Sequence, residues 1–207
     1  MREPLRGIRL GSQLLVAGGD SADENAARGT RFLLDSVDRL ETLIHDIAEY
    51  CYAEVREPDS KETDLEMVLL EAKNEISAQL KSAGATITHD PLPTVMGNAP
   101  ALTTVLRSLI GNACKFRSEA VPSIHVGVRQ QGAEWIFSVR DNGMGFDPAY
   151  RERIFRAFER LNGKKYPGSG LGLTIAKRLI NQHGGEIWAE SNPGQGATFS
   201  FSLPLAV

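Results

Sequence analysis

The sequence is poor in cysteine, in surplus positive charge and in long apolar runs. Among its 207 residues there are two cysteines, Cys51 and Cys114, which excludes a disulfide scaffold and a cysteine-based zinc cluster and suits a reducing compartment. No apolar run approaches the roughly 20 residues that cross a bilayer, and the first residues lack the apolar stretch of a signal peptide. We therefore expect a cytoplasmic segment without membrane contact.

The charge balance gives no reason to expect a nucleic-acid partner. The chain has 23 lysines and arginines against 26 acidic residues, a formal net charge of −3, and its basic residues are scattered along the sequence. Apolar residues make up 42% and charged residues 24% of the chain, which is typical of a globular protein. Its length suits one full-sized domain with a smaller attached element, or two small domains.

A heptad pattern marks the first part of the chain. Between residues 30 and 55, apolar residues recur at alternating intervals of three and four, which predicts a helix packed along another helix. This seam consists of Leu33, Val37, Leu40, Ile44, Ile47 and Cys51. A shorter helical segment ends near residue 16, and residues 18–21 connect the two. A lone hairpin would expose its seam, so we expect a homodimer with a four-helix bundle; the alternative is packing against the downstream domain.

The pattern changes after a polar linker near residue 57. Downstream, periodicity predicts a helix from residue 65 through residue 80 that ends near Gly84, with Asp64 as its cap, and further helices over residues 99–116, 150–158 and 171–182. Alternating apolar residues predict paired strands over residues 124–128 and 135–139, and again over 186–190 and 197–203. Helices and strands mix without regular βαβ alternation, so we predict an α+β fold. The expected domains are residues 1–57, the hairpin, and residues 62–207.

A first glycine-rich cluster follows the predicted strand at 135–139. Asp141, Gly143 and Gly145 combine a carboxylate with residues that let a ligand approach the backbone. The carboxylate can accept a hydrogen bond from the exocyclic amine of adenine, whereas guanine presents a carbonyl at that place. The cluster therefore indicates an adenine site if Asp141 lies at the floor of a pocket. A plain strand-to-helix turn is the alternative.

A second glycine-rich cluster opens the predicted helix at 171–182. A helix start offers free N–H groups and the positive end of the helix dipole, which together favour an anion. The cluster consists of Gly168, Ser169, Gly170, Leu171 and Gly172. Its G-x-G-x-G spacing differs from that of dinucleotide-binding folds, and no P-loop motif occurs in the sequence.

Two further groups of residues suit a metal-bound polyphosphate. The amide oxygen of Asn112 is a hard ligand that suits Mg²⁺, and Lys115, on the same face of the predicted helix, can meet phosphates. The loop at residues 159–167 carries Arg160, Lys164 and Lys165 and is typical of a mobile lid over a polyphosphate. A solvated helix face and an ordinary charged loop are the alternatives.

In this order, the clusters resemble the catalytic ATP-binding domain of sensor histidine kinases, especially the phytochrome-like subgroup, within the family of DNA gyrase B-type ATPases and MutL. The resemblance covers essentially the whole chain. It matches Asn112 and Lys115 to the N-box, Asp141, Gly143 and Gly145 to the G1 box, Ile154, Phe155 and Phe158 to the F-box, Gly168, Gly170 and Gly172 to the G2 box, and Gly194, Gly196 and Thr198 to the terminal glycine box.

The resemblance implies a two-layer α/β sandwich with a mixed sheet, preceded by a hairpin for dimerisation and phosphotransfer. It also implies ATP and Mg²⁺ as ligands, with Asn112 on the metal and Lys115 on the phosphates. The implied reaction transfers the γ-phosphoryl group of ATP to a histidine and then to an aspartate of a response regulator. Catalysis then consists largely of neutralising and aligning the phosphates.

Three features depart from the family pattern. The acceptor histidine usually precedes a segment like residues 2–6 and is absent here, so we expect no autophosphorylation at the usual place. Ser108 stands where many relatives have a further asparagine, and Asn98 stands where they commonly have aspartate. The other histidines lack metal-ligand spacing, and His45 is not expected to replace the acceptor.

Two other functions stay open on the sequence. The chain could be a non-catalytic module that binds ATP or ADP and acts as a dimeric regulatory partner. It could also be an ATPase or a serine kinase of the same superfamily, which the heptad hairpin disfavours.

Overall fold

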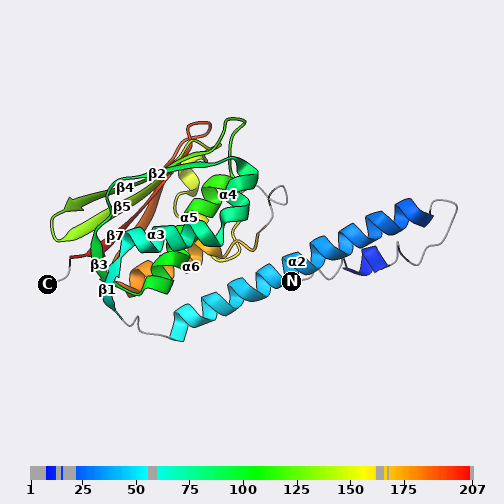
Figure 1. Cartoon of the computed structure of the whole chain (residues 1–207), viewed down its shortest axis with the longest axis horizontal. Helices are drawn as coiled ribbons and strands as arrows, with labels where there is room; N and C mark the ends of the chain where they lie inside the picture. The colour runs from blue at the N-terminus through cyan, green and yellow to red at the C-terminus, as the bar shows by residue number, and fades with distance from the viewer. Residues whose placement is uncertain are drawn as a thin grey trace. The chain divides into compact units, whose positions relative to one another are not determined.

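The computed structural model describes residues 8–12, 15, 22–55, 60–161, 166 and 168–205. Within this part, the backbone divides into two compact units (Figure 1). One unit holds the helical residues 8–12 and most of the long helix α2 (Ala22–Val55), and the other holds the sheets and the helices after α2. Neither α2 nor any other helix of the described residues combines the length and apolar character needed to span a bilayer.

Helix α2 (Ala22–Val55) is 34 residues long and begins before the predicted position at residue 30. Three residues of its heptad seam are exposed in the single chain: Val37 at 40%, Ile44 at 65%, and Cys51. Residues 8–12 are also helical, and a Cβ atom on Gly11 would lie 2.7 Å from the carbonyl oxygen of Gly29. The two helical segments thus touch through glycine. The predicted connection at 18–21 lies outside the described residues, and the four-helix bundle stays a prediction.

The large sheet has five strands in the order β2-β4-β5-β7-β6. Its strands are β2 (Thr86–His89), β4 (Ser123–Gln131), β5 (Glu134–Asp141), β6 (Ile187–Ser191) and β7 (Ala197–Pro204). Strand β2 runs parallel to β4, and the other neighbours are antiparallel. A separate antiparallel pair joins β1 (Lys61–Asp64) to β3 (Thr94–Gly97). The predicted mixed sheet is therefore confirmed.

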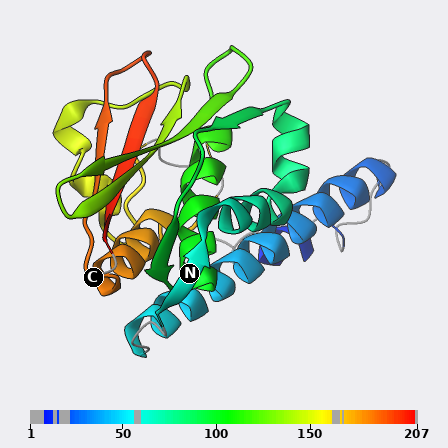
Figure 2. The ribbon, with the colours of Figure 1, turned by 60° about the vertical axis from the view of Figure 1, so that its left-hand side comes forward.

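Helices cover one face of this sheet. In Figures 1 and 2, α3 (Leu65–Glu75), α5 (Ala99–Lys115) and α6 (Gly172–Gln182) lie along the same side. The apolar stripe of α5 predicted from the sequence is buried: Leu102, Val105, Leu106 and Leu109 are each at most 1% exposed. On the sheet side, the rings of Phe137 and Phe201 stack with centroids 5.0 Å apart. The α+β class and the two-layer α/β sandwich are confirmed.

Capping residues define the helix ends. The Asp64 side chain accepts a hydrogen bond from the N–H of Glu66 at 2.9 Å, as predicted. Asn98 caps α5 in the same way by accepting from the N–H of Ala101 at 3.0 Å. Helix α4 (Ser77–Ala83) ends at Gly84, whose φ of 63° favours glycine. The amide of Asn98 therefore serves as the N-cap of α5.

Some elements differ from the sequence prediction. The helix expected over 150–158 is wrong: the segment forms two single 3₁₀ turns, η1 (Pro148–Tyr150) and η2 (Arg153–Phe155). Phe155 is buried whereas Phe158 is 63% exposed, so the segment has no continuous apolar stripe to support a longer helix. The helix expected over 65–80 is interrupted at Ile76, where φ is −107° and ψ is 20°. Strands β1, β2 and β3 have four residues each, too short for a periodic signal.

Candidate functional site

The Asp141 carboxylate lies at the end of β5 and is fixed by backbone groups. Its Oδ1 atom accepts hydrogen bonds from the N–H of Gly143 at 2.8 Å and from the N–H of Ala197 at 3.2 Å. No described residue donates to Oδ2, so this oxygen is available to a ligand. The carboxylate thereby links the G1 box to the terminal glycine loop, and one of its oxygens remains free.

The glycines around Asp141 are required by close backbone approaches. A Cβ atom on Gly143 would lie 2.5 Å from the carbonyl oxygen of Phe116, and one on Gly145 would lie 2.1 Å from that of Asn192. Gly145 also has a φ of 63°, which L side chains rarely adopt. These positions therefore have room for backbone only.

The end of α5 joins the same loops. The carbonyl oxygen of Phe116, the residue after α5, accepts from the N–H of Met144 at 2.9 Å. Asn112 and Lys115 lie in the last turns of this helix and are both half-buried. The Lys115 ammonium lies 4.8 Å from the centroid of the Phe116 ring. The structure thus brings the N-box residues to the end of the sheet where Asp141 lies.

The start of α6 meets α5 one turn before Asn112. A Cβ atom on Gly172 would lie 3.6 Å from the Ser108 hydroxyl oxygen. Gly170 has a φ of 79°, and its carbonyl oxygen accepts from the N–H of Phe158 at 3.1 Å. Leu171 is 1% exposed and anchors the loop in the core. The start of α6 is therefore positioned next to α5, as an anion site beside Asn112 would require.

Gly168 and Ser169 precede these residues. Gly168 has a φ of 134°, in the region that favours glycine, and Ser169 is half-buried. Their contact with a phosphate stays a prediction.

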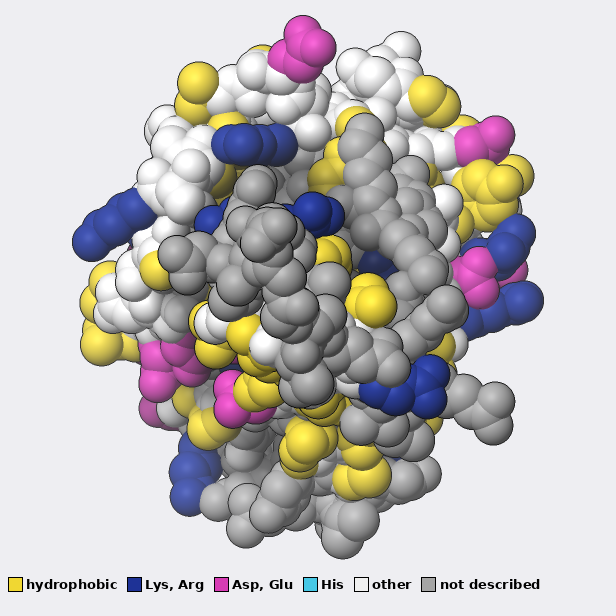
Figure 3. Space-filling model, turned by 90° about the vertical axis from the view of Figure 1, so that its right-hand side faces the viewer, with side chains coloured by type: hydrophobic (Ala, Val, Ile, Leu, Met, Phe, Trp, Pro, Cys, Tyr) yellow, Lys and Arg dark blue, Asp and Glu magenta, His cyan; other side chains and the backbone are white. Residues whose placement is uncertain are grey.

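The basic residues of the predicted lid are only partly described. The Arg160 guanidinium donates to the carbonyl oxygen of Tyr166. This hydrogen bond joins a residue near the start of the loop to one near its end. Lys164 and Lys165 lie outside the described residues. Where side chains are described on the face drawn in Figure 3, Lys and Arg are interspersed with acidic and apolar side chains.

Comparison with known proteins places this geometry in a family. Residues 97–207 match the family described as histidine kinase-, DNA gyrase B-, and HSP90-like ATPases. The chain belongs to this family. Cyanobacterial phytochrome A of Nostoc sp. is 41% identical over 207 residues, which are 99% of this chain and 27% of that protein. The chain thus spans little more than a quarter of that relative's length.

Solved structures of histidine kinases share the fold. The crystal structure of full-length ShkA in complex with AMPPNP has a TM-score of 0.72 and 31% identity, and covers 100% of this chain and 44% of that one. Histidine kinase ThkA in complex with response regulator protein TrrA has a TM-score of 0.76 and 22% identity, and covers 99% and 58%. The resemblance to sensor histidine kinases is therefore confirmed.

In this ATPase domain, two residues outside the predicted site fix the loop after β5: Ser191 joins it to the terminal glycine loop, and Asn142 joins it to the start of β4. The Ser191 hydroxyl accepts from the N–H of Phe146 at 2.9 Å and donates to the carbonyl oxygen of Gly196 at 2.7 Å. The Asn142 side chain accepts from the N–H of Ser123 at 2.9 Å and donates to the carbonyl of Val121 at 2.9 Å. Local sequence patterns do not predict the contacts with Phe146, Ser123 and Val121, because these residues are distant in sequence from Ser191 and Asn142.

Thr198 does not provide the contact to Asp141. It pairs with Arg140 on β5 and Glu190 on β6, in one row across the sheet. Neighbouring residues on a strand point to opposite faces, so Thr198 shares its face with Arg140 rather than with Asp141. The group that reaches Asp141 is the N–H of Ala197. A direct role for Thr198 in nucleotide binding stays a prediction.

Burial raises the pKa of the Asp141 carboxyl above its ordinary value, although the hydrogen bonds from Gly143 and Ala197 oppose this shift. Burial also raises the pKa of the Cys114 thiol, which is 5% exposed on α5. A buried thiol with a raised pKa is a poor nucleophile. Cys114 is therefore part of the core. For Asp141, burial makes the charged form of the carboxyl less favourable.

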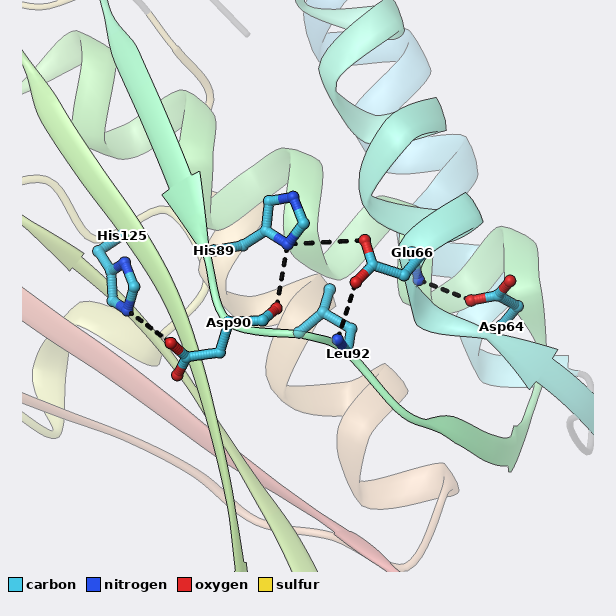
Figure 4. A network of polar contacts seen from close by, with 6 residues as sticks. All are labelled: Asp64, Glu66, His89, Asp90, Leu92 and His125. Atoms are coloured by element: carbon cyan, nitrogen blue, oxygen red, sulfur yellow. Dashed lines mark hydrogen bonds and ion pairs between the residues drawn. The ribbon is translucent and has the colours of Figure 1, made fainter.

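The histidines of this domain have protein partners. In Figure 4, His89 lies beside Glu66 and His125 beside Asp90, with nitrogen-to-oxygen distances of 3.5 Å in both pairs. These pairs connect the edge strand β2 to α3 and β4. Within the described residues, no group of three His, Cys, Asp or Glu side chains is arranged to hold a metal ion.

Alanine substitutions at Gly196 and at Gly194, a glycine with a similar φ angle, test the close backbone approach at Gly196. Gly194 and Gly196 have φ angles of 76° and 77°, but only at Gly196 would a Cβ atom meet backbone, 2.0 Å from the carbonyl oxygen of Asp141. We expect Gly194→Ala to lower the free energy of unfolding by about 1–2 kcal/mol, the cost of the left-handed conformation. Gly196→Ala should lower it clearly further in urea unfolding followed by circular dichroism. Equal losses would contradict the assigned contact.

Proposed function

We propose that the chain binds ATP with Mg²⁺ and is the ATP-binding catalytic core of a sensor histidine kinase. The observation that carries this proposal is the half-satisfied Asp141 carboxylate, with Oδ1 bound to two backbone N–H groups and Oδ2 free. The free oxygen suits the exocyclic amine of adenine. Guanine would place a carbonyl against it, and two acceptors facing each other are unfavourable.

The other end of the site suits the phosphates. The start of α6 supplies N–H groups and the positive end of a helix dipole, and Lys115 supplies a charge. The Asn112 amide is half-buried, and no hydrogen bond joins it to another described side chain, so its oxygen fits a Mg²⁺ ligand. Bound Mg²⁺ would neutralise phosphate charge there. Asn112 holds it, and Lys115 orients the phosphates.

The proposed reaction is phosphoryl transfer from ATP to a histidine. The bond between the γ-phosphorus and the bridging oxygen breaks, a phosphorus–nitrogen bond to the imidazole forms, and ADP leaves. The phosphoryl group then passes to an aspartate of a response regulator. Membership of the kinase-containing family and the fold shared with ThkA, whose structure includes a response regulator, support this partner.

Replacing Asp141 with asparagine tests the adenine assignment. In Asp141→Asn, the amide oxygen keeps the N–H groups of Gly143 and Ala197, so the amide NH₂ faces the ligand. Two donors then oppose each other at the adenine amine. We expect affinity for a non-hydrolysable ATP analogue to fall about tenfold or more, while affinity for the GTP analogue does not fall. Isothermal titration calorimetry measures both, and equal losses would refute the assignment.

The stability of the same variant serves as its control. Because the folded pKa of Asp141 is raised, the carboxyl contributes stability in its protonated form and loses it as pH rises through its folded pKa. Asparagine does not titrate, so the variant does not lose stability in this way as pH rises. The stability of the variant relative to the parent should therefore rise from acid to neutral pH. Thermal unfolding recorded at both pH values checks this and shows whether the variant is folded under the conditions of the titration.

Asn112→Ala separates catalysis from nucleotide binding. Removing the amide oxygen should lower phosphotransfer from Mg·ATP to a supplied hairpin that carries the acceptor histidine by at least about tenfold. Gln79, whose amide is committed to the carbonyl of Gly111 at 2.9 Å, offers a control: Gln79→Ala should leave the transfer nearly unchanged. Undiminished phosphotransfer in Asn112→Ala would contradict the proposal that Asn112 is a Mg²⁺ ligand. Binding without any transfer in the parent chain would favour the non-catalytic regulatory module.

The proposed assembly is a homodimer through α2. Because Ile44 and Val37 on the seam are largely exposed in one chain, a second copy would bury them. Ile44→Glu should therefore give a monomer by multi-angle light scattering. Thr42→Glu, an exposed change away from the seam, should leave the mass of a dimer. A dimeric Ile44→Glu variant would count against the bundle.

A further inference from the structure

We propose that His183 is a positioning residue for the nucleotide site, because its imidazole holds the end of α6 against the start of α5. The inference rests on the proposed function, since its consequence is nucleotide affinity. His183 follows α6 directly and lies at the opposite end of that helix from the glycine loop. It contacts no part of the candidate site, so it acts through the placement of the two helices.

Two hydrogen bonds fix the imidazole. Its Nε2 atom accepts from the backbone N–H of Asn98 at 3.0 Å, and its Nδ1 atom lies 2.7 Å from the carbonyl oxygen of Leu179. An N–H donor facing Nε2 requires that nitrogen to be unprotonated, and a carbonyl facing Nδ1 requires the proton there. The contacts therefore fit a tautomer in which Nδ1 donates to Leu179 and Nε2 accepts from Asn98.

The neighbouring chain leaves little room for the ring to move. A Cβ atom on Gly97 would lie 3.3 Å from Cδ2 of His183. Gly97 itself is tied to β1, since its carbonyl oxygen accepts from the Thr63 hydroxyl at 2.9 Å. Asn98 uses its backbone N–H for His183 and its side chain to cap α5. The imidazole thus joins α6 to a turn that is itself held in place.

Helices α5 and α6 pack against each other, and a specific contact lies near each end of the pair. The start of α5 meets the end of α6 through Asn98 and His183, and one turn before Asn112 α5 meets the start of α6 through Ser108 and Gly172. The helices therefore run antiparallel. Gly172 offers no side chain to interlock with Ser108, so the contact near the nucleotide is weak by itself. The directional contact is the one at His183, which limits rotation of α6 and fixes the glycine loop relative to Asn112.

Two amide substitutions at position 183 separate the two hydrogen bonds of the imidazole. In His183→Gln, the longer side chain can place its oxygen where Nε2 lies and accept from Asn98. In His183→Asn, the shorter side chain reaches only the Nδ1 position and can donate to Leu179 while leaving the Asn98 N–H without an acceptor. Both variants lose the ring and gain an amide, so they form a matched pair.

The experiment measures binding of a non-hydrolysable ATP analogue to the full chain by calorimetry, with thermal unfolding recorded for each variant. We expect His183→Gln to bind within about twofold of the parent and His183→Asn to bind at least about fivefold more weakly, the usual effect of one lost hydrogen bond. Equal affinities in the two variants would overturn the inference. Absence of binding in the parent chain would instead overturn the proposed function.

Amide hydrogen exchange gives a second readout that does not depend on the folding of a variant. Coupling between two sites is reciprocal, so the nucleotide analogue should slow exchange of the Asn98 amide in the parent chain and in His183→Gln, although this amide lies at the far end of α5. A ring that only fills space would leave the exchange rate unchanged on nucleotide addition. That result would also overturn the inference.

Discussion

The site depends on one carboxylate that is bound on one side and open on the other. Asp141 binds the N–H groups of Gly143 and Ala197 through the same oxygen, which directs its second oxygen without a further side chain. Burial opposes the charge and raises the pKa of the carboxyl, and the two hydrogen bonds offset part of that effect. The glycines of both loops follow from this arrangement, because side chains would separate the backbones that supply the donors.

The sheet and two helices bring together motifs that are far apart in sequence. Strand β5 lies between β4 and β7, so the end that carries Asp141 is next to the turn before β7. The residue after α5 binds Met144, and the start of α6 lies against Ser108. Antiparallel packing of α5 and α6 places the end of one beside the start of the other. The amide of Asn112 and the start of α6 therefore lie at the same edge of the domain.

The sequence alone predicted the parts of this arrangement that local chemistry determines. The apolar stripe of α5, the cap at Asp64 and the glycine loops all have short-range signals, and the structure has them where they were expected. Ser191, Ala197 and His183 were missed because each makes a hydrogen bond to a segment distant in sequence. The Ser191 hydroxyl and the His183 imidazole accept from backbone N–H groups, and the Ala197 N–H donates to the Asp141 carboxylate. The segment at 150–158 was predicted wrongly, because apolar residues at helical spacing do not reveal that Phe158 is exposed.

Two side chains that the sequence analysis marked as departures from the expected pattern are Asn98, the N-cap of α5, and Ser108 on α5, and both make a contact in the structure. Asn98 caps the helix with an amide oxygen in place of a carboxylate and offers its N–H to His183. Ser108 approaches Gly172 with a hydroxyl that is smaller than an amide. A cap needs an acceptor rather than a charge, and a contact to glycine needs a short distance rather than a particular group. Both contacts therefore depend on the short distance between α5 and α6 and not on a charged side chain at these positions.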